Sequence, residues 1–351
     1  MNTATNKTTL LRLGLFFQDC LNRFEDTESD IVSIDLQNEI NLAVDLITTA
    51  KRENGWFTKD SVLGVYTAWA NSLNETKVDQ WFKSYDFKAG KSKKVGVIMA
   101  GNLPLVGLHD ALSVIISGNV LHAKLSSKDK SLMMLLLNVI KRISLDDHCI
   151  KIVEQLKDID VLIATGSDNS ARYFEYYFKD KQRIIRKNRT SIAVLNGNEN
   201  SDELNGLSHD VFQHFGLGCR NVTKLYLPRG FDLDVVFKAL FHYKEIGFHN
   251  KYANNYDYNK AIYLLNQEEL IENGFLLMKE DKGLHSPVGV LFYEFYDTLE
   301  EIQVIIEEQK DSLQCVVTNE ELPQKVAFGK AQNPELWDYA DGIDTIEFLL
   351  K

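Results

Sequence analysis

Residues 94–104 read KVGVIMAGNLP, a short apolar run that ends in a turn of Gly, Asn and Pro. Such a run is typical of a strand that is buried on both faces of a sheet. Apolar residues at helical spacing follow it over 106–116. A strand, a turn and a helix in this order predict one unit of a parallel sheet that is covered by helices.

Two further units of this kind follow along the chain. The runs 119–124 and 160–164 are short and apolar, and helical patterns over 132–143 and 169–178 come after them. Three strand–turn–helix units in succession predict a parallel sheet of the Rossmann type.

Polar or small residues stand where each of these strands ends. Asn102 follows the first strand, Lys124 ends the second, and Gly166 and Ser167 follow the third. Because ligands of open parallel sheets bind beyond the carboxyl ends of the strands, we expect these residues at one ligand-binding edge.

The chain continues the α/β pattern after this sheet. A second series of strands and helices runs from 190–195 to 314–317, whereas the aromatic-rich segment 242–258 predicts an irregular stretch. Helical spacing over residues 9–85 predicts a helical N-terminal lead-in. The fold class that we expect is therefore α/β, with two Rossmann-type parallel-sheet domains behind this lead-in.

The turn-rich segment 196–200 marks the expected boundary between the two domains. Residues 1–195 then hold the lead-in and the first sheet, and residues 196–351 hold the second sheet and a C-terminal tail. A chain of 351 residues is long enough for two domains of ordinary size.

Composition excludes several classes of function. The chain is 44% hydrophobic and 25% charged, and its net charge of −11 with no dense Lys/Arg run argues against a nucleic-acid partner. No apolar stretch reaches the length of a membrane span, and the polar start of the chain lacks the pattern of a signal peptide. Four scattered cysteines fit free thiols in a reducing cytoplasm, and their spacing predicts no metal site.

The cysteine at 219 is the residue that chemistry singles out. Residues 215–221 read FGLGCRN, so glycine directly precedes Cys219 and leaves room for a carbonyl to approach its sulfur. A thiol there can act as a nucleophile, while nearby backbone N–H groups stabilise an oxyanion. The segment alone also fits a small buried hydrophobe beside a turn.

Six short motifs, taken together, resemble those of the aldehyde dehydrogenase superfamily in order and in spacing. They are Asn102 in Gly-Asn-Leu-Pro, Lys124, Thr165-Gly166-Ser167, Gly216-Leu217-Gly218-Cys219, Ser286-Pro287-Val288 and Phe328-Gly329. The closing residues 334–342 look specific to the acyl-CoA reductase branch, which includes the fatty acyl-CoA reductase of bacterial luminescence. The resemblance covers the chain from about Val95 to its end.

The resemblance implies roles for individual residues. It implies that Cys219 is the catalytic nucleophile and that the Asn102 amide, with the Cys219 backbone N–H, holds the oxyanion. It places the nicotinamide cofactor in residues 1–195 and the nucleophile in residues 196–351. The cofactor-binding residues that it implies are Lys124, Ser126, Ser127, Gly166 and Ser167.

Departures from the family pattern sharpen the expected reaction. The glutamate that activates water in hydrolytic relatives falls on Ile185, inside residues 182–189, which contain no carboxylate. A thioacyl enzyme without a positioned base reacts slowly with water and survives to accept hydride. We therefore expect reduction of an acyl-CoA to an aldehyde, with release of coenzyme A. A second family glutamate, which holds the nicotinamide ribose, falls near Gly283 and leaves that contact open.

The choice of cofactor depends on Ser127, which stands where the family often has a ribose-binding glutamate. Lys124, Ser126, Ser127 and Lys128 could together accept a 2′-phosphate, so we expect NADPH, with NADH also possible. The alternative is that these residues only cap the start of a helix.

Other functions stay open at this point. One is a conventional aldehyde dehydrogenase or an acylating semialdehyde dehydrogenase, and another is a non-enzymatic scaffold that carries an acyl group on the thiol. His209 and His214 precede Cys219 and suggest a Cys/His hydrolase pair, although their spacing favours helix surface or core positions. Relatives of this superfamily form dimers or tetramers, so we expect a homodimer or a larger assembly.

Overall fold

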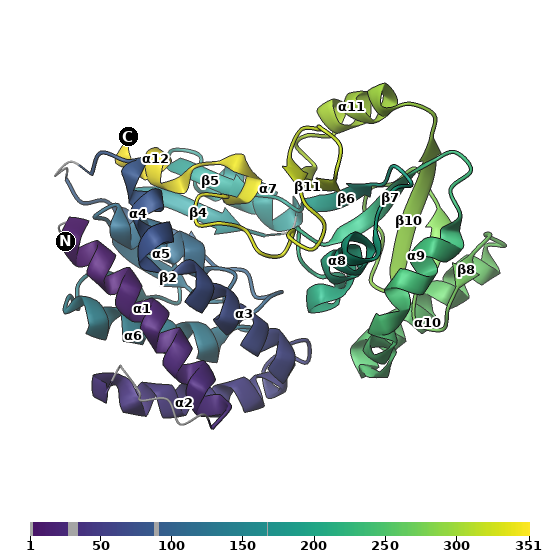
Figure 1. Ribbon diagram of the computed structural model, residues 1–351. Helices are drawn as coiled ribbons and strands as arrows, with labels where there is room; N and C mark the ends of the chain where they lie inside the picture. The colour runs from purple at the N-terminus through teal and green to yellow at the C-terminus, as the bar shows by residue number, and fades with distance from the viewer. Residues whose placement is uncertain (1–2, 27–33, 88–90, 167) are drawn as a thin grey trace. The chain divides into compact units, whose positions relative to one another are not determined.

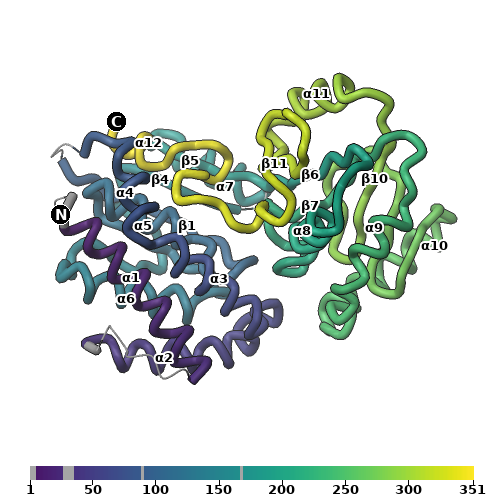
Figure 2. Tube along the Cα trace, in the orientation of Figure 1, coloured from purple at the N-terminus to yellow at the C-terminus, as the bar shows by residue number. Residues whose placement is uncertain are grey.

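The computed structural model describes residues 3–26, 34–87, 91–166 and 168–351 (Figures 1 and 2). The chain forms two compact units, one of Met1–Lys187 with Glu335–Lys351 and one of Asn188–Pro334. The division differs from the expected boundary after residue 195 because the strand at 190–194 pairs within the second sheet. The assignment of cofactor binding to the first domain and of the nucleophile to the second stays a prediction.

The first unit begins with a layer of helices, as the sequence predicts. They are α1 (Thr3–Phe24), α2 (Gln37–Thr49), α3 (Lys59–Ser72) and α4 (Glu75–Lys83), with 3₁₀ turns η1 (Ile34–Leu36) and η2 (Ala50–Arg52). Side chains start two of them, since Thr58 accepts from the Ser61 N–H at the start of α3 and Asn74 accepts from the Lys77 N–H at the start of α4. One face of each helix is buried in a core that is continuous with the first sheet.

The first sheet is fully parallel. Its strands are β1 (Lys94–Ile98), β2 (Val120–Lys124), β3 (Ile150–Ile152), β4 (Val161–Thr165) and β5 (Gln182–Arg186), and its helices are α5 (Leu108–Ile116), α6 (Lys130–Ser144) and α7 (Asp168–Tyr177). The strand order β3-β2-β1-β4-β5 places β1 at the centre, so the chain moves outward in one direction and then returns to the other side of β1. The three predicted strand–turn–helix units are confirmed.

The C-terminal segment belongs to this first unit. It contains the 3₁₀ turn η5 (Ala340–Gly342) and α12 (Thr345–Leu350), which packs against α5 (yellow in Figure 2). The Tyr339 hydroxyl accepts from the buried Trp81 indole at 2.7 Å. Arg186 forms a buried ion pair with Asp110 and also donates to the Thr345 hydroxyl at 2.9 Å. These contacts explain why the chain returns to the first sheet after it has formed the second.

The second unit contains a seven-stranded sheet. Its strands are β6 (Thr190–Val194), β7 (Val222–Pro228), β8 (Ile271–Glu272), β9 (Leu277–Glu280), β10 (Val290–Tyr296), β11 (Leu313–Thr318) and β12 (Lys325–Val326), in the order β12-β11-β6-β7-β10-β9-β8. Its helices are α8 (Ser201–Phe212), α9 (Leu233–Leu240), α10 (Asn250–Leu265) and α11 (Leu299–Glu308) with 3₁₀ turns η3 (Gln213–Gly216) and η4 (Phe241–Phe248). All neighbouring strands are parallel except β8 and β9, which are antiparallel. The α/β class with two parallel sheets is confirmed.

The prediction of an irregular segment at 242–258 is wrong. Residues of this stretch form most of η4 and the first half of α10. Tyr252 and Tyr256, four residues apart, are buried on one side of α10, but Tyr258 and Leu264 are exposed. Because the apolar residues of α10 are distributed around its whole circumference, its sequence lacks the one-sided apolar period that identifies a helix. Within the described part of the chain, no helix combines the length and the apolar character that a membrane crossing requires.

Candidate active site

The loop that carries Cys219 follows directly from the end of α8. Asn200 and Glu203 form a reciprocal capping box that starts α8, and the helix ends at Phe212. His214, Phe215 and Gly216 then have φ angles of 52°, 62° and 75°. Glycine adopts this left-handed region freely, whereas other residues pay about 1–2 kcal/mol each. Three such residues in succession turn the chain sharply toward β7.

Cys219 differs from the other cysteines in its exposure. Of the four cysteines, all of them described, Cys219 is exposed, and Cys20, Cys149 and Cys315 are buried. Burial raises the pKa of each buried thiol above its ordinary value, so those three thiols resist ionisation. Of the four thiols, that of Cys219 is therefore the one that a molecule from solution can reach.

A strand of the second sheet holds the backbone of Cys219 through a hydrogen bond. The Ser191 hydroxyl, on β6, lies 3.0 Å from the Cys219 carbonyl oxygen and donates to it. The same hydroxyl oxygen accepts the Cys315 N–H of β11 at 3.2 Å. Cys219 therefore lies at the amino end of β7, on a loop that is bonded to a neighbouring strand.

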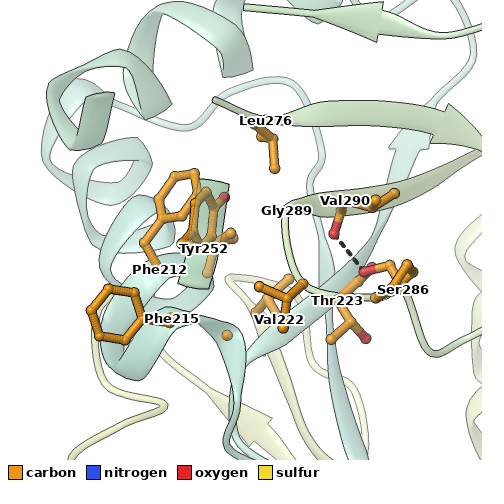
Figure 3. Close-up of a pocket in the computed structure, with 13 residues that line it drawn as sticks. Phe212, Phe215, Val222, Thr223, Tyr252, Leu276, Ser286, Gly289 and Val290 are labelled. Atoms are coloured by element: carbon orange, nitrogen blue, oxygen red, sulfur yellow. Dashed lines mark hydrogen bonds between the residues drawn. The ribbon is translucent and has the colours of Figure 1, made fainter. Parts of the chain in front are cut away.

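A small cavity lies beside this loop in the second unit (Figure 3). The rings of Phe212, Phe215 and Tyr252 gather on one side of it, and Thr223 and Ser286 lie on the other. Its volume of about 20 Å³ has room for a water molecule and not for an acyl chain. The Tyr252 side chain is 2% exposed, and its hydroxyl has no hydrogen-bond partner among the described residues, so an ordered water suits this position.

The motif Ser286-Pro287-Val288 forms part of the wall of this cavity. The Ser286 hydroxyl lies 2.8 Å from the Thr223 carbonyl oxygen and 2.7 Å from that of Val290 (Figure 3). The motif therefore joins the turn before β10 to β7, next to the Cys219 loop. The residues of the second late motif, Phe328-Gly329, contact α8 instead, since Gly329 donates its N–H to Asp210 at 2.7 Å.

Two histidines and one aspartate near the loop have shifted pKa values. Burial lowers the pKa of His214 to about 4 and also lowers that of His209, whose Nδ1 lies 2.9 Å from the Tyr243 hydroxyl. Burial raises the pKa of Asp210 to about 7, although its carboxylate accepts the N–H groups of Gly329 and Ala331. Asp210 is fully buried with both oxygens engaged, so it is a structural carboxylate and not a base for water.

The other predicted site residues lie on the first unit. Asn102, Lys124 and Gly166 follow or end β1, β2 and β4, which are adjacent strands at the point where the strand order reverses. This is the position at which open parallel sheets bind ligands. The structure therefore brings these three residues to one edge of one sheet, as predicted. Ser167 lies outside the described residues.

Ser126 and Ser127 follow β2 at the same edge. A Cβ atom on Gly101 would collide with the Ser126 hydroxyl, so glycine lets the turn at Asn102 approach this serine. Ser126 also accepts the Lys128 N–H at 3.2 Å, and Ser127 and Lys124 are exposed. Ser126 thus has a local capping contact, while the exposed ammonium and hydroxyl suit an anionic or ribose group.

Glu53, which sequence reasoning missed, reaches this edge from the helical lead-in. Its carboxylate accepts the N–H groups of Lys130 and Ser131 in the first turn of α6. The next residue, Asn54, donates to the Gly101 carbonyl at 3.0 Å. No motif identifies these contacts, because Glu53 lies 77 residues before its partner in the sequence.

The structure also shows where the two residues lie that stand at the positions of the family glutamates, Ile185 and Gly283. Ile185 lies on β5, the edge strand of the first sheet. Gly283 is exposed and donates its N–H to Asp281, whose other oxygen pairs with Lys279. Glu280, close in sequence, is exposed at an open hollow of about 310 Å³. The residue that holds a nicotinamide ribose stays open.

The fold is that of the aldehyde dehydrogenases. Aldehyde dehydrogenase 21 from Physcomitrella patens, solved with the reaction product succinate, aligns with 100% of this chain and 84% of its own at a TM-score of 0.68 and 12% identity. The indole-3-acetaldehyde dehydrogenase AldA from P. syringae, solved with NAD+, aligns with 91% of this chain and 72% of its own at a TM-score of 0.63 and 15% identity. An NAD-dependent aldehyde dehydrogenase from Sinorhizobium meliloti aligns with 91% and 70% at a TM-score of 0.62 and 12% identity.

No sequence model of a protein family matches the chain, and no curated protein matches it in sequence. At identities of 12% to 15% the structural matches establish the fold, and activity has to be argued from the site.

Proposed function

We propose that this protein reduces an acyl-CoA, of the fatty acyl class, to the aldehyde with a reduced nicotinamide cofactor and through a thioester on Cys219. The observation that carries the proposal is the exposure of Cys219 on a loop bonded to the sheet, in a fold shared with aldehyde dehydrogenases. Ile185, which carries no carboxylate, stands where hydrolytic relatives have their water-activating glutamate. This favours transfer of hydride over hydrolysis.

The first half of the reaction forms a thioester on the enzyme. The Cys219 thiolate attacks the carbonyl carbon of the acyl-CoA, and the negative charge moves to the carbonyl oxygen. The Asn102 amide and the Cys219 N–H donate to this oxyanion, which lowers the barrier by an amount worth about a hundredfold in rate per donor. The tetrahedral intermediate then expels coenzyme A as its thiolate, which takes up a proton.

The second half of the reaction releases the aldehyde. A reduced nicotinamide cofactor, when bound, would supply the hydride that the thioacyl carbonyl carbon accepts. Asn102 and the Cys219 N–H again hold the oxyanion, now that of a hemithioacetal. Its carbon–sulfur bond breaks, the aldehyde leaves, and Cys219 returns as thiolate. Overall, one acyl-CoA, one hydride and one proton give one aldehyde and one coenzyme A.

The residues at the edge of the first sheet fit a nicotinamide cofactor. Lys124 and Ser127 present an exposed ammonium and hydroxyl where the strand order reverses, and Gly166 adjoins the start of α7. Lys124, Ser126 and Ser127 favour NADPH through its 2′-phosphate. The carboxylate of Glu53 opposes that preference by its charge, so NADH is the second cofactor that we expect.

One assay separates this function from its alternatives. NADPH absorbance is followed with a panel of acyl-CoAs for the wild type, for Cys219→Ala and for Cys149→Ala as a control at a buried thiol. Consumption that disappears only in Cys219→Ala supports the reductase. Activity with aldehyde, NAD+ and water but without acyl-CoA favours a conventional dehydrogenase, and acylation without NADPH consumption favours an acyl-carrying scaffold.

The proposal extends to the setting of the enzyme. Coenzyme A is its released partner, and a reducing cytoplasm keeps Cys219 as a free thiol. A homodimer or larger assembly is expected, and sedimentation of the purified protein tests this.

A further inference from the structure

Asn221, two residues after Cys219, makes an unusual number of contacts with the loop. Its side chain is fully buried. Its Oδ1 accepts the Gly218 N–H at 2.8 Å, and its Nδ2 lies 3.0, 3.2 and 2.8 Å from the carbonyl oxygens of Asp210, Val211 and Gln213. One amide group therefore connects the end of α8 to the residue that precedes Cys219.

The end of α8 explains why an amide is needed there. The last carbonyls of a helix have no partner within the helix and need one from elsewhere. Here the chain turns left-handed at His214, so Asn221 supplies the donors for Asp210, Val211 and Gln213. An asparagine offers two N–H donors and one acceptor on the same planar group, a combination that neither aspartate nor serine provides.

The other side of the amide fixes the turn that holds the thiol. The Asn221 N–H donates to the Gly218 carbonyl at 3.0 Å, so residues 218–221 form a closed turn with Cys219 at its second position. The Asn221 side chain binds the Gly218 N–H at the same time. Because that N–H is engaged, it is not the donor for an oxyanion in the proposed reaction.

We propose that Asn221 is the positioning residue of the active site. It does not touch the substrate, and it sets the orientation of the Cys219 sulfur and of the Cys219 peptide N–H relative to the end of α8. This inference rests on the proposed function for its effect on turnover, but its effect on the thiol itself does not depend on which reaction the enzyme performs.

Substitution of Asn221 should lower turnover more than substrate binding. Small displacements of catalytic groups cost about a hundredfold in rate, because the oxyanion contact strengthens only in the transition state. We expect Asn221→Ala to lower kcat for acyl-CoA reduction by about 10- to 100-fold and to change KM by less than about threefold. Asn221→Asp keeps the acceptor for Gly218 but places a carboxylate oxygen against three carbonyl oxygens at a fully buried position, so its loss should be at least as large.

Ser208 provides a control on α8, the helix whose end Asn221 binds. It is fully buried, and its hydroxyl lies 3.0 Å from the carbonyl oxygens of Leu204 and Ala239, away from the Cys219 loop. Ser208→Ala should lower stability and leave both kcat and the chemistry of the thiol unchanged.

The deciding experiment measures the rate of Cys219 alkylation by iodoacetamide against pH, with the labelled peptide identified by mass. The profile of Asn221→Ala should move away from that of the wild type, and the profile of Ser208→Ala should not. Equal profiles for the wild type and Asn221→Ala would overturn the proposal. If the wild type alkylates normally and reduces no acyl-CoA, the proposed function fails and the alkylation profiles still decide the role of Asn221.

A measurement on the wild type covers the case in which Asn221→Ala does not fold. The Gly218 N–H should exchange with solvent deuterium as slowly as the buried amides of β7, because a buried side chain holds it. Rapid exchange of the Gly218 amide in the folded wild type would equally contradict the proposal.

Discussion

Ser191 donates its hydroxyl proton to the backbone carbonyl of Cys219 over 3.0 Å, and so ties the exposed thiol to a buried strand. The same oxygen lies 3.1 Å from the Cys315 sulfur and accepts the Cys315 N–H. One hydroxyl therefore joins β6, β11 and the Cys219 loop. The position of Cys219 therefore depends on a contact that lies outside the motifs identified in the sequence.

Replacing Ser191 with alanine should lower the free energy of unfolding by about 1–3 kcal/mol, because the buried Cys315 N–H and the half-buried Cys219 carbonyl lose a partner. Urea unfolding of the purified protein measures this change. Thr48→Ala removes a hydroxyl that donates to the Asp45 carbonyl on the exposed face of α2, and it serves as the control with a change below about 0.5 kcal/mol. A Ser191→Ala protein as stable as the wild type would show that the contact does not hold the loop.

Gly206 on α8 lies against the backbone of Phe328 and Gly329. A Cβ atom at position 206 would stand 2.8 Å from the Gly329 nitrogen and 2.8 Å from the Phe328 carbonyl carbon. Alanine gains about 1 kcal/mol of helix propensity at this position. The collision with rigid backbone costs about 1–3 kcal/mol or more, so Gly206→Ala should be destabilising overall.

The neighbouring exposed residue provides the comparison for this substitution. Asn205→Ala gains the same kind of helix propensity without a collision and should slightly raise the melting temperature. If Gly206→Ala raised the melting temperature as much as Asn205→Ala, the close approach of α8 to Phe328 and Gly329 would be disproved.

His214 should make stability depend on pH below neutrality. Burial lowers its pKa in the folded protein to about 4, against about 6.5 in an unfolded chain. The unfolded chain then binds more protons between these values, so stability is lost as the pH falls from 6.5 toward 4. The full effect is no more than about 3 kcal/mol and is smaller because the ring is partly exposed.

His214→Asn removes this titration and keeps a residue that tolerates the left-handed conformation. The stability of the wild type minus that of the variant, measured by urea unfolding from pH 7 to pH 4, should decrease as the pH falls. A constant difference over this interval would contradict the buried, neutral state of His214.

Glu53 should affect the choice between the two cofactors. Its carboxylate lies at the first turn of α6, directly after the residues proposed for the 2′-phosphate. Removing one negative charge near a phosphate is worth about 1 kcal/mol, or about fivefold in KM. Glu53→Gln should therefore lower the KM for NADPH relative to that for NADH by about this factor.

Glu39 provides the control, because its carboxylate pairs with Arg142 in the last turn of the same helix. Glu39→Gln removes one charge from the opposite end of α6 and should leave the ratio of the two KM values unchanged. Equal ratios in Glu53→Gln and the wild type would exclude Glu53 from cofactor selection.

The sequence predicts the buried strands well and the edge strands poorly. β1 and β4 are continuous apolar runs because both of their faces are covered, and this signal needs no knowledge of the partner strands. β5 lies at an edge and reads QRIIR, with polar residues on both sides of Ile184 and Ile185, so its sequence resembles a polar loop. α10 was missed for a related reason: its apolar residues lie on all sides of the helix, so its sequence shows no helical period.

The residues of the candidate site also differ in how well the sequence predicts their positions. Asn102 and Lys124 could be placed from the rule for carboxyl ends of parallel strands, whereas Cys219 stands at the amino end of β7, where that rule does not apply. The glycines beside the cysteine and the resemblance of this segment to a family motif are what single it out in the sequence. Glu53, Ser191 and Asn221 make long-range or backbone contacts, which depend on the folded chain and leave no pattern in the sequence.

The central claim is that Cys219 carries an acyl group that reacts with hydride and not with water. The direct test is the intact mass of the protein after incubation with a fatty acyl-CoA and no cofactor, followed by addition of NADPH. We predict that the wild type gains the mass of one acyl group, keeps it for many minutes in buffer, and loses it as aldehyde when NADPH is added. The account would be contradicted if no adduct formed, if the adduct also formed on Cys219→Ala, or if water released it as the free acid.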